Sequence, residues 1–363
     1  MTGTAQRLAA EFDDAFRIAV DDGSAQLLKV SVRPPSEAFG PPAPGPTFQT
    51  ALLLHLAAAA PELPVQRVTA ALDGRPEVIL GSRLARMASW LDGRTLSDDG
   101  TAHRGAAGTP LRRDIGGTLA RLSRALRRFS DPGAHRTHQW DLQQFGALRP
   151  LLDDLPPGGT LPQVSQALAA SGDAAARLGR DGWLRAALTD CLDRFSAVVA
   201  PQLARTAAQV IHADFHGENL LTDGARITGI LDFGDALSGP VAMDLGIAAC
   251  YQLASGPELL ATAPGGFGDK PGAGPDVLAP ALDVVAGYHE ADPLSADDVS
   301  LTAEFIVARV ATRIIVSQWN ALREPANRGY LLRRTPQAIG QLAALRRLTP
   351  DEIAGRLRAA CGM

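Results

Sequence analysis

The alternation of apolar and polar residues over residues 1–90 is typical of short β-strands. Residues 15–20 alternate like a strand, residues 27–32 form an apolar strand, and the Asp-Asp-Gly-Ser sequence between them favours a tight turn. Residues 77–80 and 84–90 have the pattern of two further strands. We therefore expect a small β-rich N-terminal lobe whose first two strands form a hairpin.

The remainder of the chain, residues 91–363, has mainly helical patterns. Residues 109–129 repeat apolar positions at helical spacing, and longer segments with this pattern cover 276–290 and 297–322. Residues 255–274 are rich in Gly and Pro and predict an insertion between helices. The sequence thus predicts an α+β protein with lobes 1–90 and 91–363.

Polar residues gather between three apolar pairs in the second lobe. Asp214, Asn219 and Asp232 are flanked by Val210-Ile211, Leu220-Leu221 and Ile230-Leu231, which predict short buried strands. Two carboxylates and one carboxamide held by such strands suit the positioning of a hydroxyl and of a magnesium ion beside a polyphosphate. The alternative is that these residues only form turns and strand ends.

The spacing of these residues is similar to the H-x-D-x-x-x-x-N and D-F-G motifs of kinases. By this resemblance Asp214 is the catalytic base, and Asn219 and Asp232 are the metal ligands. His212 would support the loop by hydrogen bonds. Asp235 would assist the metal shell or cap a turn.

Lysine is rare in this chain, which has only Lys29 and Lys270 among 35 basic residues. Lys29 lies inside an apolar strand, where an ammonium group is costly to bury unless it meets an anion. In kinases the lysine of such a strand binds the α- and β-phosphates. We therefore assign Lys29 to nucleotide binding. The alternative is an edge-strand lysine with its head in water.

With these motifs the chain resembles the aminoglycoside phosphotransferase and choline kinase superfamily. Within it, the chain is most similar to hydroxylysine kinase-like proteins and to the kinase domain fused to class III aminotransferases. The resemblance is concentrated between residues 210 and 250. It implies a two-lobed protein-kinase-like fold, with ATP or GTP and Mg²⁺ between the lobes. It also implies a small molecule bearing a hydroxyl group as phosphoryl acceptor.

Four residues of the second lobe are candidates for binding this acceptor: Tyr288, Glu290, Arg309 and Arg313. Arginines would suit a carboxylate and Glu290 an amine, which together fit an amino alcohol or a hydroxy amino acid. The alternative is that they pack or cap helices.

Two other functions stay open. The helix after the Lys29 strand usually offers a Glu to that lysine, but here Thr47 and Gln49 occupy the expected positions. A nucleotide-binding pseudokinase is therefore one alternative. The other is an antibiotic (aminoglycoside-type) O-phosphotransferase, which would use the same core with a different pocket.

Composition excludes several classes of partner. The net charge of −4 gives no reason to expect nucleic-acid binding, and no apolar stretch is long enough to span a bilayer. Three scattered Cys argue against a disulfide framework or a zinc site. Without a signal-peptide pattern at the start, we expect a cytoplasmic protein; its oligomeric state is left open.

Overall fold

The computed structural model describes residues 3–8, 14–31, 45–80, 83–98, 106–179, 182–256, 259–260 and 275–363. They form two compact units. The first holds Met1–His103, Arg121–His138 and Gln209–Ser238, and the second holds Arg104–Ala120, Gln139–Ala208 and Gly239–Met363. The predicted boundary at residue 90 stays a prediction. Most of the predicted 255–274 insertion lies outside the described residues.

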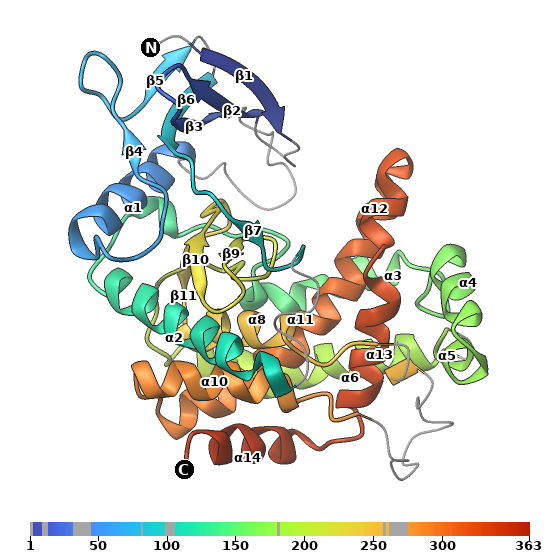
Figure 1. Ribbon diagram of the computed structural model, residues 1–363. Coiled ribbons are helices and arrows are strands. Elements are labelled where there is room, and N and C mark those ends of the chain that lie inside the picture. The colour runs from blue at the N-terminus through green and yellow to red at the C-terminus, as the bar shows by residue number, and fades with distance from the viewer. Residues whose placement is uncertain are drawn as a thin grey trace. The chain divides into compact units, whose positions relative to one another are not determined.

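The first unit contains a six-stranded antiparallel sheet in the order β1-β2-β3-β6-β4, with β5 also paired to β6 (Figure 1). Its strands are β1 (Gly3–Leu8), β2 (Asp14–Val20), β3 (Ala25–Ser31), β4 (Val68–Thr69), β5 (Val78–Leu80) and β6 (Arg83–Ser89). The predicted hairpin is β2-β3, and Gly23 at its turn has a φ of 87°, a conformation that glycine adopts without strain. The pattern analysis did not predict β1.

The same unit holds one helix and several short strands. Helix α1 (Gly45–Ala59) contacts β4. Strands β7 (Arg94–Thr95), β9 (Leu220–Thr222) and β10 (Ile227–Ile230) form a second sheet in the order β10-β9-β7, and β8 (Gln209–Ile211) pairs with β11 (Leu237–Gly239). The connections of these strands carry the polar residues singled out in the sequence.

The second unit is built from helices. Helix α2 (Thr109–Leu126) contributes residues 109–120 to it and the rest to the first unit. The others are η3 (Leu142–Leu148), α3 (Arg149–Asp153), α4 (Pro162–Ala170), α5 (Asp173–Leu178), α6 (Trp183–Arg194), η4 (Phe195–Val199), α7 (Ala200–Leu203), α8 (Val241–Tyr251), α10 (Ala279–Ala291), α11 (Ala296–Arg323), α12 (Arg328–Leu332), α13 (Thr335–Leu345) and α14 (Pro350–Ala360). The predicted α+β class, with a strand-rich part and a mainly helical part, is confirmed.

Helix α11 is the centre of the second unit. It begins with a capping box, in which Ser295 and Asp298 exchange side-chain and backbone hydrogen bonds. Its contacts reach α8, α13 and α14, so most of its faces are buried. This accounts for its nearly continuous apolar pattern.

Helices α8 and α11 pack tightly against each other at Gly246. A Cβ atom built there would lie 2.5 Å from Cβ of Phe305, closer than real Cβ contacts allow. We expect Gly246→Ala to lower the free energy of unfolding by about 1–3 kcal/mol, because the helices must separate to admit the methyl group. Urea denaturation followed by circular dichroism measures this change.

Gly355→Ala on α14 is the matched control. A Cβ at that position meets no atom within 4 Å. This variant should be unchanged in stability or more stable by up to about 1 kcal/mol, since alanine favours the helix over glycine. Equal stabilities of the two variants would contradict the packing argument.

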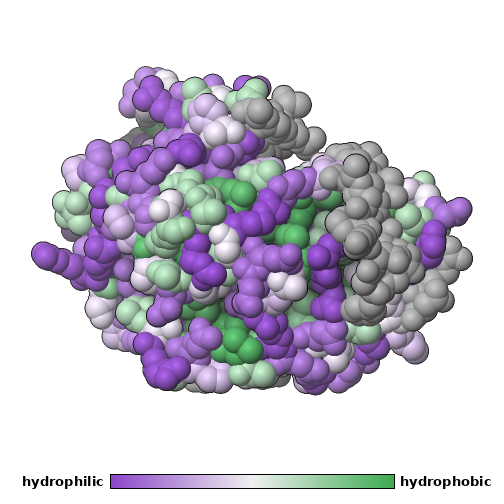
Figure 2. Space-filling model, turned by 90° about the horizontal axis from the view of Figure 1, so that it is seen from below, coloured by the Kyte–Doolittle hydropathy of each residue, from purple (hydrophilic) through white to green (hydrophobic). Residues whose placement is uncertain are grey.

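The molecular face in Figure 2 is mainly hydrophilic, with apolar residues in separate groups between polar ones. Large apolar side chains of the described helices are instead concentrated in the interior, where Phe48, Phe145 and Phe305 are fully buried. Among the described residues, no helix is sufficiently long and apolar to cross a bilayer.

Candidate functional site

The candidate site is built on the connections between β8, β9 and β10, all in the first unit. Strand β8 ends at Ile211, the loop 212–219 leads into β9, and β10 ends at Ile230 just before Asp232. The strands are buried and paired, so their ends hold the connecting loops at fixed positions.

His212 is fully buried and fastens the first loop to the second. Its Nε2 donates to the carbonyl oxygen of Leu231 at 2.9 Å, and its Nδ1 accepts from the backbone N–H of Asp214 at 3.2 Å. Its ring also lies 4.8 Å from that of Phe233. The imidazole thus joins the residues before Asp214 to those before Asp232.

Two residues of the site have strained backbones. Ala213 has a φ of 63° and Asp232 a φ of 50°, and no other described non-glycine residue has a positive φ. Residues with side chains adopt this region at a cost of about 1–3 kcal/mol, and such strain concentrates at functional sites. Ala213 directly precedes the predicted base Asp214, and Asp232 is itself a predicted metal ligand.

Asp214 is held by two side chains of its own loop. Its Oδ2 accepts from Nε2 of His216 at 3.0 Å and from Nδ2 of Asn219 at 2.8 Å. Nδ2 of Asn219 also donates to the backbone carbonyl of Asp214. His216 is oriented in turn, because its Nδ1 accepts from the N–H of Glu218. The carboxylate therefore has a defined direction.

Lys29 and Asp232 form an ion pair across 203 residues of sequence. Nζ of Lys29 lies 3.0 Å from Oδ1 of Asp232, and the N–H of Gly234 donates to the same oxygen. The Lys29 side chain is 17% exposed and that of Asp232 50%. Desolvation favours the neutral acid, but the Lys29 ammonium and the Gly234 N–H outweigh it and hold the pKa of Asp232 below its ordinary value.

Three carboxylates share this part of the unit. The negative charge of Asp214 raises the pKa of Asp232, against the larger effect of Lys29. The pKa of Asp235 is raised above its ordinary value, mainly by burial and in part by the charges of Asp214 and Asp232. Mutual repulsion of this kind is relieved by a bound cation.

The loop after Asp232 is held by two residues of the segment 131–138. Nε of Arg136 donates to the carbonyl of Ala236 at 2.9 Å, and its Nη2 donates to that of Gly234. Nε2 of His138 lies 3.2 Å from the carbonyl oxygen of Asp235. The Arg136 guanidinium also lies over the ring of Phe48 of α1. Arg136 is therefore positioned to fix the loop that carries Asp232.

For the phosphotransfer that the kinase motifs imply, we expect Arg136→Met to lower kcat about tenfold, because hydrogen bonds that involve a charged group contribute about 1.5–3 kcal/mol each to stability and here hold the loop of Asp232 in place. Methionine keeps the apolar contact with Phe48 and removes only the donors. Steady-state kinetics at saturating nucleotide measure the effect.

Arg226→Met is its control, since Arg226 is an exposed arginine of the same unit paired with Asp223. It should leave kcat unchanged. If Arg136→Met also leaves kcat unchanged, the loop does not depend on Arg136.

Gln49 and Thr50 of helix α1 accept hydrogen bonds from Arg86 rather than from Lys29. Nη2 of Arg86 donates to Oε1 of Gln49 at 3.1 Å, and Nη1 donates to Oγ1 of Thr50 at 3.0 Å. The Thr50 hydroxyl bonds in turn to Glu77. Arg86 is the cross-strand neighbour of Lys29 on β6. The side chain of Thr47 lies outside the described residues.

The acceptor candidates lie in the second unit, and three of the four are buried: Tyr288, Arg309 and Arg313. Arg309 lies over the rings of Trp140 and Tyr251. Arg313 lies over the Tyr251 ring and donates to Gln341.

Glu290 is exposed and pairs with Arg113. The acceptor-binding role of all four candidates stays a prediction.

Sequence reasoning did not select His216, Arg136 or His138. His216 lies two residues after Asp214 in the same loop. That short spacing could have indicated that its side chain contacts the Asp214 carboxylate. Arg136 and His138 carry no such signal, because they reach the site from a segment about 100 residues away.

Comparison with known proteins gives the family. A model described as the phosphotransferase enzyme family matches residues 4–281. Hydroxylysine kinase of Danio rerio is 26% identical over 170 residues, which are 46% of this chain and 43% of that protein. Hydroxylysine kinase of Mus musculus is 22% identical over 264 residues, 69% of this chain and 57% of that protein. The chain thus spans about half the length of these curated relatives.

Among solved structures, an amicoumacin kinase in complex with AMP-PNP, Ca²⁺ and Ami is similar in fold. Its TM-score is 0.58 at 15% identity, covering 92% of this chain and 87% of that one. This likeness confirms the predicted kinase-type fold. The family match covers most of the sequence, including both loops of the candidate site, and the chain therefore belongs to the phosphotransferase enzyme family.

Proposed function

We propose that this protein transfers the γ-phosphoryl group of ATP or GTP to a hydroxyl group of a small molecule. The observation that carries the proposal is the cluster formed by Lys29, Asp214, Asn219 and Asp232 within the first unit. A cation, a base and two oxygen ligands in one place are the groups that phosphoryl transfer requires.

The residues present fit a magnesium ion. A carboxylate and an amide oxygen are hard donors, and Mg²⁺ commonly takes one or two protein ligands together with phosphate oxygens. Asp232 would bind through its carboxylate and Asn219 through Oδ1, since its Nδ2 already donates to Asp214. The repulsion among Asp214, Asp232 and Asp235 supports a cation there. Bound Mg²⁺ would neutralise charge on the phosphates.

Lys29 exchanges partners in this proposal. Its ammonium pairs with the carboxylate of Asp232 in the structure. When the triphosphate binds, the ammonium moves to the α- and β-phosphate oxygens and releases the carboxylate. A flexible lysine can make this exchange more readily than a planar guanidinium, which suits its use at this position.

Asp214 orients the acceptor hydroxyl and takes its proton. His216 and Asn219 both bond to Oδ2, which leaves the direction of the carboxylate fixed for an in-line attack. The transition state of phosphoryl transfer is loose, so positioning matters more than basicity.

For the acceptor we propose a hydroxy amino acid or amino alcohol, and hydroxylysine is the first compound to test. The support is the similarity to two hydroxylysine kinases. A pseudokinase is the second candidate. Gln49 of α1 stands where kinases usually have the glutamate that pairs with the strand lysine, and it accepts a hydrogen bond from Arg86 instead.

The test is nucleotide turnover by the purified protein with Mg²⁺ and either ATP or GTP. Hydroxylysine, other amino alcohols and aminoglycosides are supplied separately, and ³¹P NMR identifies a phosphate ester. A new ester with an amino alcohol supports the proposal. Ester formation only with aminoglycosides would move the assignment to an antibiotic phosphotransferase. Nucleotide binding without any ester would favour the pseudokinase.

A further inference from the structure

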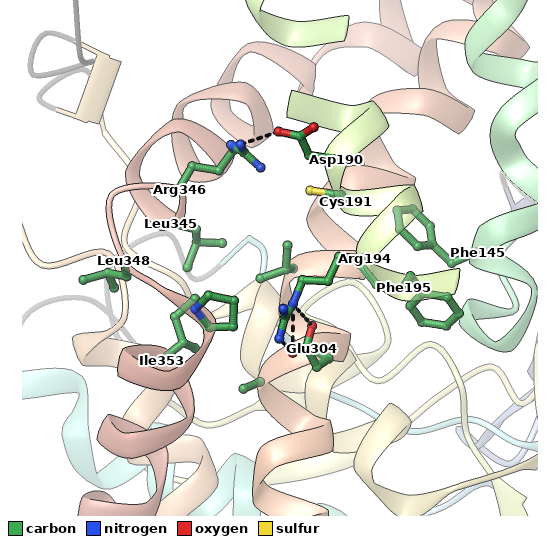
Figure 3. Close-up of a pocket in the computed structure, with 14 residues that line it drawn as sticks. Phe145, Asp190, Cys191, Arg194, Phe195, Glu304, Leu345, Arg346, Leu348 and Ile353 are labelled. Carbon is green, nitrogen blue, oxygen red and sulfur yellow. Dashed lines mark hydrogen bonds and ion pairs between the residues drawn. The ribbon is translucent and has the colours of Figure 1, made fainter. Parts of the chain in front are cut away.

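The second unit contains a cavity of about 220 Å³ (Figure 3). Phe145 of η3 and Phe195 of η4 form one apolar wall, with their rings edge to face at 5.3 Å. Leu345, Leu348 and Ile353 form another. An apolar cavity of about 150 Å³ can hold benzene, so this volume admits a body of one ring or a short branched chain.

One ion pair at the cavity is fixed. Arg194 of α6 binds Glu304 of α11 through both Nε and Nη2, with Nη2 at 2.6 Å from Oε1. The Glu304 side chain is only 19% exposed. The hydrogen bond to Glu304 raises the pKa of Arg194. A ligand that displaced Glu304 would have to replace several charge-assisted hydrogen bonds, so we expect this ion pair to stay intact when a ligand binds.

The second ion pair is exchangeable. Nη2 of Arg346 lies 2.7 Å from Oδ2 of Asp190, whose side chain is 53% exposed. Water can solvate the Asp190 carboxylate if it leaves, and ion pairs with an exposed partner contribute little to stability. A carboxylate from a ligand can therefore take the place of Asp190 at Arg346.

The thiol of Cys191 lines the cavity between these pairs without adding charge (Figure 3). Burial raises its pKa to about 11, against the smaller opposing effect of Arg346. The thiol is thus protonated at neutral pH. The remaining lining is apolar, so the exchangeable contact is the one at Arg346.

We propose that this cavity binds a small monocarboxylic acid with an apolar body of about one ring, whose carboxylate pairs with Arg346 in place of Asp190. The site shares no residue with the phosphotransfer cluster. Nine of its fourteen lining residues, from Ala303 to Ile353, lie beyond the segment 4–281 that matches the family. It is therefore a ligand site additional to the proposed reaction.

The experiment uses the full chain and isothermal titration calorimetry. The probe is 3-phenylpropionate, and the comparison compounds are 3-phenylpropan-1-ol, which lacks the charge, and acetate, which lacks the ring. We expect one saturable site for the probe and binding about tenfold weaker for both comparison compounds, because each loses one of the two contacts.

Two variants distinguish this site from non-specific binding. Asp190→Asn removes the competing charge and should tighten probe binding several-fold. Arg346→Gln should weaken it about tenfold while leaving the alcohol unchanged. The matched control is Arg356→Gln on α14, which breaks an exposed ion pair with Asp276. This variant should bind the probe with unchanged affinity.

Absence of saturable probe binding would overturn the proposal, as would equal binding of acid and alcohol. Should Arg346→Gln fail to fold, Asp190→Asn decides alone, and an unchanged affinity in that variant rejects the site. None of these outcomes depends on phosphotransferase activity.

Discussion

Replacing Asp214 by Asn is expected to lower kcat by about 10²–10⁴-fold while the protein remains folded. Asparagine keeps the size of the side chain and can still accept from His216 and Asn219 through its oxygen. It cannot take the proton of the acceptor hydroxyl. The loss should therefore appear in kcat, with little change in the KM for nucleotide, in a coupled assay of ADP or GDP release.

Asp223→Asn is the matched control. Asp223 belongs to the turn between β9 and β10, where it accepts from the backbone N–H groups of Ala225 and Arg226. Asparagine can accept at least one of these bonds, so both turnover and thermal stability should be preserved. Near-normal turnover of Asp214→Asn would remove Asp214 from the role of base.

Replacing Asp232 by Asn is the second change with a large expected effect. Asp232 would hold the Mg²⁺ that stabilises negative charge on the phosphates, and removal of one stabilising interaction of this kind costs about 10²–10³-fold in kcat, so we expect a loss of that size. The variant should also require more Mg²⁺ for half-maximal rate, because the charged ligand is gone. Rates measured across a magnesium titration separate this effect from a general loss of activity.

The ion pair with Lys29 provides a check on this interpretation. Lys29→Met should raise the KM for nucleotide while leaving the magnesium requirement near that of the unaltered protein. A magnesium requirement that is the same in Asp232→Asn and in the unaltered protein would show that Asp232 does not bind the metal.

Several elements could be predicted from local pattern alone. The β2-β3 hairpin and helices α2, α10 and α11 follow from alternation, helical spacing and turn residues, which act between neighbours in the chain. Strand β1 was missed because its residues are mostly exposed, so burial imposes no apolar alternation on them. Arg112 of α2 is buried and paired with Asp283. A salt bridge to a distant residue leaves no trace in the helix pattern.

The sequence by itself determined the chemical types in the site and their order, because Asp214, Asn219 and Asp232 lie within one strand-loop-strand segment. Only the tertiary structure decided their partners. Lys29 meets Asp232 because β3 and the end of β10 are brought together by folding.

Arg136 and His138 hold the loop after Asp232 from a separate segment, while Gln49 and Thr50 turn to Arg86 instead of Lys29. Such pairings depend on which helices and strands lie next to each other in the folded protein. The spacing of residues along one helix or strand does not show which other elements will be its neighbours.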